Sequence, residues 1–215
     1  MGLRLVAFDL DSTLLDLEGI DALAKCVGHE REVAQVTKTA MEGGIPFKES
    51  LLQRVRYLKG LSHADYVKCA HAAPLVDGAS LLFTWLHQEK IQTCILSGGF
   101  EEFAKAAQKR LGTDQFFANR LQFLDGVCTG EVIPPILDAD GKSSALKKYA
   151  ESQGIKLNEV AAVGDGANDI QMLQTAAVGI AFHPKPALAR LSKYVVSEKN
   201  LTNLIPLLRD FETLC

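Results

Sequence analysis

Short apolar runs rich in β-branched residues recur along the chain, and each one ends in polar or glycine-rich residues. Between these runs, apolar positions recur at the spacing of an α-helix. Strands that alternate with helices predict an α/β fold, in which helices cover both faces of a parallel sheet. The expected strands are 3–8, 91–96, 160–163, 178–182 and 194–196, and the expected helices include 79–90, 100–111 and 143–153.

Two segments depart from this alternation. Residues 123–136 contain Asp125-Gly126 and Thr129-Gly130, and they predict a small β-hairpin. Residues 16–74 hold no strand-like run, and they are far longer than an ordinary connection in an α/β domain. We therefore expect a core of residues 1–15 and 75–215, with residues 16–74 inserted as a helical cap above one end of the sheet.

The first expected strand ends in Asp9-Leu10-Asp11-Ser12-Thr13. In an extended segment, residues two apart point to the same side, so the carboxylates of Asp9 and Asp11 are expected to lie close together. Like charges repel and each loses water, so a cation, a proton or a phosphoryl group must compensate them. An acidic turn that caps the following helix is an equally weighted alternative for this motif alone.

A second acidic segment, residues 163–169, follows the expected strand 160–163. Gly164 and Gly166 bracket Asp165, and Asn168 and Asp169 follow. Carboxylate oxygens are the hard ligands that Mg²⁺ prefers. Alone, this segment is better explained as a turn and a helix N-cap. In parallel sheets, however, strand ends meet at one edge, and two acidic strand ends there indicate a shared cation.

Two further segments have the features of a phosphate-binding site. Ser97-Gly98-Gly99 lies between an expected strand and an expected helix, where backbone N–H groups cradle an anion; a common turn is the alternative. Lys142 lies at the expected start of a helix, where a cation opposes the helix dipole. A solvated lysine is the usual explanation, and a lysine held for a dianionic phosphate is the sharper one.

The expected cap carries a cation on an apolar stripe. Phe47, Leu51 and Val55 recur at helical spacing, and Arg54 lies seven residues after Phe47 on the same face. A guanidinium there suits a clamp on a carboxylate, unless it only extends outward to solvent. Glu18 lies seven residues after Asp11; it either faces the same cavity and holds an ammonium group or is a surface acid.

Composition narrows the classes of function. The 215 residues are 47% hydrophobic and 23% charged, and the net charge of −3 gives no indication of a nucleic-acid partner. No apolar run approaches the roughly 20 residues of a membrane span, and the start of the chain lacks the apolar region of a signal peptide. The cysteines are odd in number, scattered and without a C-x-x-C pair, which favours a cytoplasmic location; they are Cys26, Cys69, Cys94, Cys128 and Cys215. Neither a P-loop nor a dinucleotide fingerprint is present, which argues against a nucleotide-dependent kinase or a dehydrogenase.

The order of the motifs resembles the haloacid dehalogenase superfamily. The matching segments are Asp9-Leu10-Asp11-Ser12-Thr13, which has the D-x-D-x-T form of its phosphatases, Ser97-Gly98-Gly99, Lys142 and residues 164–169. A finer pattern is similar to the phosphoserine phosphatases of bacteria and archaea. That pattern comprises Ala40-Met41-Glu42-Gly43, Phe47-x-x-Ser50-Leu51, Arg54-Val55, Phe117-Ala118-Asn119-Arg120 and residues 163–169. The resemblance covers nearly the whole chain, and it implies a Rossmann-like core with a helical cap of the C1 type after the first strand.

The resemblance also implies the reaction. It implies Mg²⁺-dependent hydrolysis of L-phosphoserine to serine and phosphate, the last step of serine biosynthesis, through an aspartyl-phosphate. Asp9 is then the nucleophile, and Asp11 protonates the leaving oxygen and later activates water. Mg²⁺ is held by Asp9, the backbone carbonyl of Asp11 and Asp165, with Asp169 in support.

The same resemblance assigns the substrate contacts. Residues around the phosphate are Ser97, Gly98, Gly99, Lys142 and Asn168. In the cap, Glu18 binds the ammonium group, Arg54 binds the carboxylate, and Met41 and Phe47 form the walls. The expected partner is therefore a small phosphorylated amino acid, with no nucleic acid or membrane, and the chain is expected to be a monomer or a homodimer.

Three other functions stay open at this point. The same chemistry on phosphothreonine or phosphohomoserine is the nearest, and transfer of the phosphoryl group to an acceptor such as homoserine is another. A receiver-like signalling module is a different class, but it needs neither Asp11 as an acid nor a cap over a substrate. An observation of rapid multiple turnover would exclude it.

Overall fold

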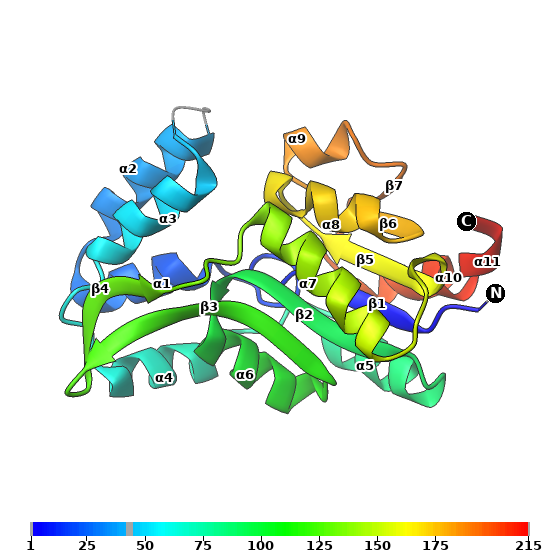
Figure 1. The fold of residues 1–215 in the computed structure, drawn as a ribbon, viewed down its shortest axis with the longest axis horizontal. Coiled ribbons are helices and arrows are strands. Elements are labelled where there is room, and N and C mark those ends of the chain that lie inside the picture. The colour runs from blue at the N-terminus through cyan, green and yellow to red at the C-terminus, as the bar shows by residue number, and fades with distance from the viewer. Residues whose placement is uncertain (1, 42–44, 215) are drawn as a thin grey trace.

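The computed structural model describes residues 2–41 and 45–214, and the side chain of Met41 is not among the described atoms. A seven-stranded sheet of order β4-β3-β2-β1-β5-β6-β7 runs through the molecule (Figure 1). Neighbouring strands are parallel except for the antiparallel pair β3 and β4. The strands are β1 Leu5–Phe8, β2 Gln92–Phe100, β3 Gln115–Leu124, β4 Val127–Ile133, β5 Val160–Gly164, β6 Val178–Phe182 and β7 Tyr194–Val196.

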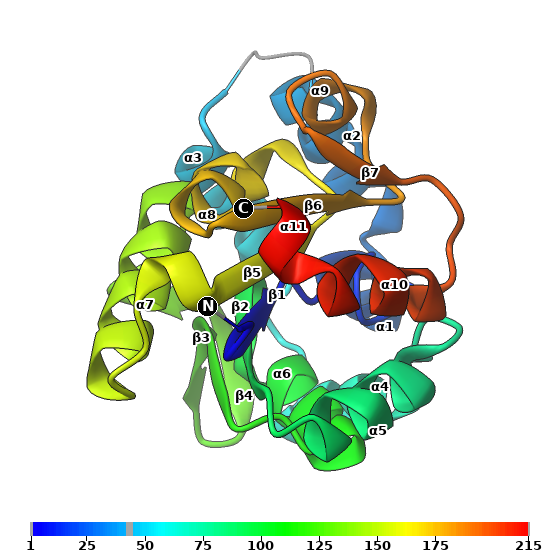
Figure 2. The ribbon, with the colours of Figure 1, turned by 90° about the vertical axis from the view of Figure 1, so that its right-hand side faces the viewer.

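Helices cover both faces of this sheet, as the alternating pattern predicts. The helices of the core are α5 Ala79–Gln88, α6 Glu101–Leu111, α7 Ala139–Ser152, α8 Ile170–Thr175, α9 Pro186–Ala189, α10 Leu204–Arg209 and α11 Phe211–Leu214, with short 3₁₀ turns η1 Leu157–Glu159, η2 Ala167–Asp169 and η3 Leu201–Asn203. In Figure 2, α7 and α8 lie on one face, and α5, α6 and α10 lie on the other. The predicted α/β fold is therefore confirmed.

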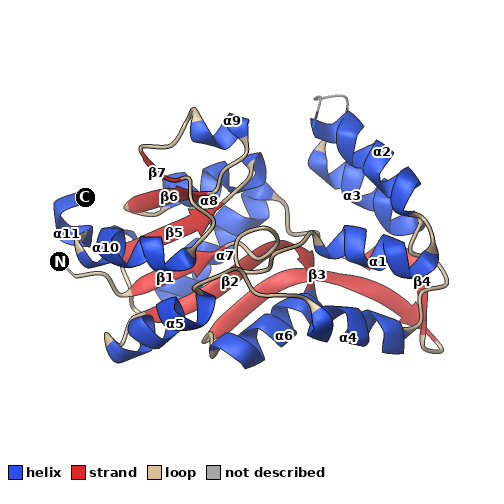
Figure 3. Ribbon diagram, turned by 180° about the vertical axis from the view of Figure 1, so that it is seen from behind, coloured by secondary structure: helices blue, strands red, loops and turns tan. Residues whose placement is uncertain are grey.

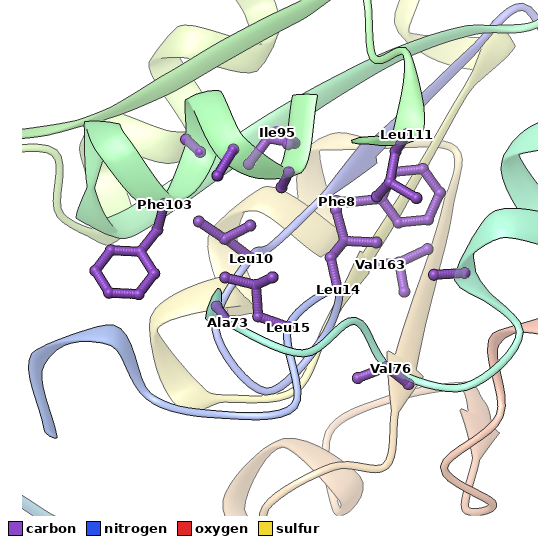
Figure 4. Packing of buried hydrophobic residues seen from close by; sticks show 14 of the residues in the cluster. Phe8, Leu10, Leu14, Leu15, Ala73, Val76, Ile95, Phe103, Leu111 and Val163 are labelled. Carbon is purple, nitrogen blue, oxygen red and sulfur yellow. The ribbon is translucent and has the colours of Figure 1, made fainter. Parts of the chain in front are cut away.

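Strand β1 shows why both faces are covered. All of its residues are buried, and their side chains alternate between two apolar clusters: Val6 and Phe8 face α5 and α6, whereas Leu5 and Ala7 face α7 and α8. Phe8 packs there with Leu111, Leu14 and Val163 in Figure 4. A strand buried on both faces reads as one continuous apolar run, which is why the sequence identifies it.

The insertion between β1 and α5 is helical, as predicted. It contains α1 Gly19–Val27, α2 Glu30–Met41, α3 Phe47–Arg56 and α4 His63–Ala72. In Figures 1 and 3, α2 and α3 project from the core beyond the carboxyl ends of the strands, and α1 and α4 lie at the base. The two ends of the insertion meet where Asp16 N donates to Pro74 O. The exact boundaries at residues 16 and 74 stay a prediction.

Three details differ from the expected elements. Strand β2 continues to Phe100, so Ser97, Gly98 and Gly99 lie in an irregular part of the strand, where the register with β3 shifts. The hairpin is longer than expected because β3 already begins at Gln115 and joins the main sheet through β2. Helix α7 begins at Ala139, because Asp138 caps it through Gly141 N, so Lys142 lies inside the helix. No helix of residues 2–41 and 45–214 is long and apolar enough to cross a membrane.

Candidate active site

The register of the central strands brings the acidic segments together. Phe8 pairs with Ile95 of β2 and with Val163 of β5. The residues that follow these positions therefore reach the same edge of the sheet, and Asp9 N donates to Val163 O across it. The candidate site lies at the carboxyl ends of β1, β2 and β5, the location at which open α/β sheets bind ligands.

Three buried carboxylates form the floor of this site. One oxygen each of Asp9, Asp165 and Asp169 lies within 4.8 Å of the others. Burial, then Asp169, raises the pKa of Asp9 well above its usual value, and burial raises that of Asp165 to about 6. Such crowded carboxylates need a compensating cation, and their hard oxygens suit Mg²⁺. The donor set therefore fits a divalent metal ion.

Lys142 supplies one positive charge to this floor. Its side chain is completely buried, and Nζ lies 2.5 Å from Asp9 Oδ1 and 2.7 Å from Asp169 Oδ1. Burial lowers the pKa of Lys142, but Asp169 and Asp9 outweigh this effect and raise it. Complete burial excludes the solvated lysine that we considered as the usual explanation.

Asp169 is held in place by backbone donors. Its Oδ2 accepts hydrogen bonds from Asp165 N at 3.1 Å and Gly166 N at 3.0 Å. Position 164 must be glycine, since a Cβ there would lie 2.5 Å from Asp169 Cγ. Asn168 is half-buried beside this turn and donates to Asp169 Oδ1 at 3.4 Å. The carboxylate of Asp169 is thus fixed by this turn and does not point into open space.

Asp11 lies beside the floor but in different surroundings. Its Oδ1 accepts a hydrogen bond from Gly19 N at 2.8 Å, and Ser97 Oγ donates to its Oδ2 at 3.5 Å. Burial, then the charge of Glu18, raises the pKa of Asp11 to about 7, although the Gly19 amide lowers it. Two nearby carboxyl groups with unlike partners suit unlike roles in one reaction.

The residues of β2 at the edge of the site, Ser97 to Gly99, are closely packed. Ser97 is fully buried, and its Oγ accepts a hydrogen bond from Gly99 N at 2.9 Å. A Cβ at Gly99 would lie 2.2 Å from Asp11 Oδ2, so only glycine fits there. Asn119 donates to Gly98 O at 2.8 Å and ties this edge to β3.

The cap residues reach the same site from above. Phe47 packs over Gly98, where an added Cβ would lie 2.9 Å from Phe47 Cζ. Arg54 Nε donates to Ser50 O at 3.3 Å, and its Nη1 donates to Thr37 Oγ1 at 3.4 Å. Burial lowers the pKa of Arg54, while the charges of Asp21, Glu18 and Asp11 raise it. The predicted contact at Met41 lies outside the described side chains.

Glu18 precedes α1 and has partners of its own. Its Oε1 accepts hydrogen bonds from Ser12 Oγ at 3.0 Å and from Lys185 Nζ at 3.1 Å. Lys185 also lies 3.0 Å from Asp165 Oδ2, so it joins the cap to the floor. The sequence reasoning missed Lys185, and it gave no role to Asn119. Lys185 comes shortly after β6, and the rule that ligands bind beyond strand ends identifies that loop.

Comparisons with known proteins agree with this geometry. The family model described as haloacid dehalogenase-like hydrolase matches residues 3–177. The chain is 40% identical over 208 residues to a phosphoserine phosphatase of Idiomarina loihiensis. These residues make up 97% of this chain and 94% of that protein.

Solved structures are similar over the same extent. A phospho-aspartyl intermediate analogue of phosphoserine phosphatase superposes with a TM-score of 0.90 at 37% identity, over 96% of this chain and 99% of that one. A substrate-bound phosphoserine phosphatase complex superposes with the same TM-score, at 36% identity and the same coverage of both chains. The chain described here therefore belongs to the haloacid dehalogenase-like hydrolases and, within them, to the phosphoserine phosphatase family.

Proposed function

We propose that this protein hydrolyses L-phosphoserine to L-serine and phosphate through an aspartyl-phosphate on Asp9. The observation that carries the proposal is the pairing of two unlike carboxyl groups at one strand end. Asp9 is buried and ion-paired to Lys142, whereas Asp11 is held by the neutral donors Gly19 N and Ser97 Oγ. The similar proteins named as phosphoserine phosphatases support the substrate class.

In the first step, a carboxylate oxygen of Asp9 attacks phosphorus and the bond from phosphorus to the serine oxygen breaks. Asp11 donates a proton to that oxygen, so serine leaves as a neutral alcohol. In the second step, water attacks phosphorus and gives its proton to Asp11. The bond from phosphorus to Asp9 breaks, and phosphate and the free carboxylate are restored.

Lys142, Ser97 and the backbone around Gly98 and Gly99 are assigned to the phosphate oxygens, and Asn168 is assigned to the bound phosphate or substrate. The charge of Lys142 favours the ionised form of Asp9 and adds positive charge where the transferring group is most negative. Catalysis of this kind consists largely of positioning and charge stabilisation. A rigid, buried set of donors is therefore the arrangement that the reaction requires.

We assign Mg²⁺ to the carboxylates of Asp9 and Asp165 and the backbone carbonyl of Asp11, with Asp169 orienting the set. When bound, the ion neutralises negative charge on the phosphate oxygens. The cluster of carboxylates within 4.8 Å and the raised pKa of Asp9 support this assignment, because both indicate that positive charge is needed there.

The cap supplies contacts for an amino acid. Arg54 is assigned to the substrate carboxylate and Glu18 to its ammonium group, with Phe47 as a wall. Ser12 and Lys185 both contact Oε1 of Glu18, so Oε2 is the oxygen assigned to the ammonium. Closure of α2 and α3 over the site would then exclude water until serine has left.

The test is phosphate release from L-phosphoserine, phosphothreonine, phosphohomoserine and p-nitrophenyl phosphate, each with Mg²⁺ and with EDTA. We expect metal-dependent release with a strong preference for L-phosphoserine. Metal-dependent release without that preference would keep the phosphatase and contradict the roles of Glu18 and Arg54. No release from any of the four would point to phosphoryl transfer or signalling.

A further inference from the structure

A pair of cysteine side chains lies at the base of the cap, away from the carboxylate floor. Cys26 is in the last turn of α1 and is exposed, and Cys69 is in α4 and is half-buried. They are 43 residues apart in the sequence, yet their Sγ atoms lie 3.3 Å from each other. Cys69 Sγ also contacts Ala22 O at 3.6 Å, which points it along α1 toward Cys26.

This distance is close to that needed for a covalent bond. A disulfide is about 2.05 Å long, so the sulfur atoms need to approach by little more than about 1 Å. The exposed thiol of Cys26 has room to rotate toward Cys69. Of the other described cysteines, Cys94 and Cys128 are buried in the core, and burial raises the pKa of Cys94, which makes its thiol unreactive.

The two thiols differ in their access to an oxidant. Burial, and after it the neighbouring Cys26, raises the pKa of Cys69 to about 11. Cys69 is therefore the poorer attacking group. Cys26 is the thiol that meets a solute first, and Cys69 is positioned to react with its oxidised sulfur.

We propose that Cys26 and Cys69 form a reversible disulfide when the protein meets a hydroperoxide. With hydrogen peroxide, the Cys26 thiolate attacks one peroxide oxygen, the O–O bond breaks, and sulfenic acid and hydroxide form. The hydroxide takes up the proton that the Cys26 thiol lost on ionisation, which gives water. Cys69 sulfur then attacks the Cys26 sulfur, hydroxide leaves and takes the Cys69 proton, and a second water forms. The two sulfurs lose one electron each and the peroxide gains two. A dithiol reductant restores both thiols by exchange.

The position of the pair determines what the bond constrains. Its loop contains α2 and α3, and α3 carries Phe47 and Arg54, while α1 and α4 form the base (Figures 1 and 3). That base is already anchored: Gly19 N holds Asp11, and Tyr66 OH accepts a hydrogen bond from Glu102 N at the start of α6. The disulfide therefore links two helices, α1 and α4, that are already held in place, and it leaves α2 and α3 free to move. We expect greater stability and unchanged turnover.

The test uses the purified 215-residue protein, treated with a small excess of hydrogen peroxide and then alkylated. Before alkylation, we expect an intact mass lower by two hydrogen atoms. After alkylation, we expect a peptide linking Cys26 to Cys69 in a non-reducing digest. The thermal midpoint should rise by roughly 5–15 °C, since the bond closes a loop of more than forty residues. Dithiothreitol should reverse both changes, and phosphate release should be the same before and after.

Cys26→Ser and Cys69→Ser should each abolish the cross-link and the rise in the midpoint, while Cys215→Ser, a matched loss of one thiol outside the pair, should keep both. The proposal is overturned if Cys26 gains oxygen atoms while Cys69 stays open to alkylation. A dimer linked through Cys26 would overturn it as well. A cross-link that lowers the thermal midpoint or stops turnover would contradict the inference that α1 and α4 form a base that is already held in place.

Discussion

Two ion pairs at this site show how its two layers differ. On the floor, Lys142 and Asp9 have side chains that are 0% and 5% exposed, whereas Lys185 and Glu18 at the cap are 42% and 39% exposed. Breaking a buried pair leaves an uncompensated charge and costs about 3–5 kcal/mol, but an exposed pair is worth about 0–1 kcal/mol. The layer assigned to the chemistry is therefore rigid, and the layer assigned to substrate recognition is open to water and adjustable.

Turnover should be lost when Asp9, the proposed nucleophile, is changed. For Asp9→Asn we expect turnover to fall at least about a thousand-fold, because an amide does not form the acyl-phosphate. Lys142 keeps its bond to Asp169, so the fold should survive. Phosphate release and the thermal midpoint measure the two effects, and Asp140→Asn, exposed on α7, is the matched control. Activity near that of the native protein would show that Asp9 is not the nucleophile.

Lys142→Met should damage both stability and activity. Asp9 and Asp169 lose their shared cation, so we expect the free energy of unfolding to fall by about 3–5 kcal/mol. Phosphate release should fall by roughly a hundred- to a thousand-fold. Urea denaturation and steady-state kinetics measure these changes. Lys148→Met, on an exposed position of the same helix, should change neither; equal effects of both substitutions would contradict the special position of Lys142.

Arg54→Ala should separate recognition from chemistry. Loss of the proposed contact between Arg54 and the substrate carboxylate should raise KM for L-phosphoserine by roughly 10- to 100-fold. The effect on kcat should be small, and p-nitrophenyl phosphate, which has no amino-acid carboxylate, should be hydrolysed as before. Arg56→Ala, exposed on the same helix, is the control. A fall in kcat on both substrates would place Arg54 in the chemistry.

Glu18→Gln should have the smallest effect of the four. We expect KM for L-phosphoserine to rise by about 3- to 10-fold, because an amide holds an ammonium group less strongly than a carboxylate does. The free energy of unfolding should change by less than about 1 kcal/mol, since the pair with Lys185 is exposed. Substrate kinetics and denaturation check both expectations. An equal loss on p-nitrophenyl phosphate would contradict a role in recognition alone.

The sequence predicted the strands that are buried on both faces more reliably than those that are not. The central strand β1 is one apolar run, and its identity does not depend on its neighbours. In contrast, β3 mixes Asn119, Arg120 and Gln122 with apolar residues, pairs in parallel with β2 at its start and is antiparallel to β4 at its end. Its strand character comes from those partners, and no single period describes it.

The residues of the site also divide into those that the sequence predicted and those that only the tertiary structure places. Asp9, Asp11, Asp165 and Asp169 follow strands that the sequence identifies, and parallel strands bring their carboxyl ends to one edge. The rule on strand ends identifies the loop of Lys185, but nothing in the sequence indicates that its side chain lies between Glu18 and Asp165. Cys26 and Cys69 were interpreted as scattered thiols because their contact depends on how α1 meets α4.

Taken by itself, the sequence determined the α/β fold, the helical insertion and the motifs whose spacing carries the chemistry, because local periodicity and short-range geometry encode them. Only the tertiary structure decided that Lys142 is buried between two carboxylates, that Asp11 and Asp9 have unlike surroundings, and which long-range pairs meet. These properties depend on desolvation and on distances between residues far apart in the chain, and both arise only when the helices have packed onto the sheet.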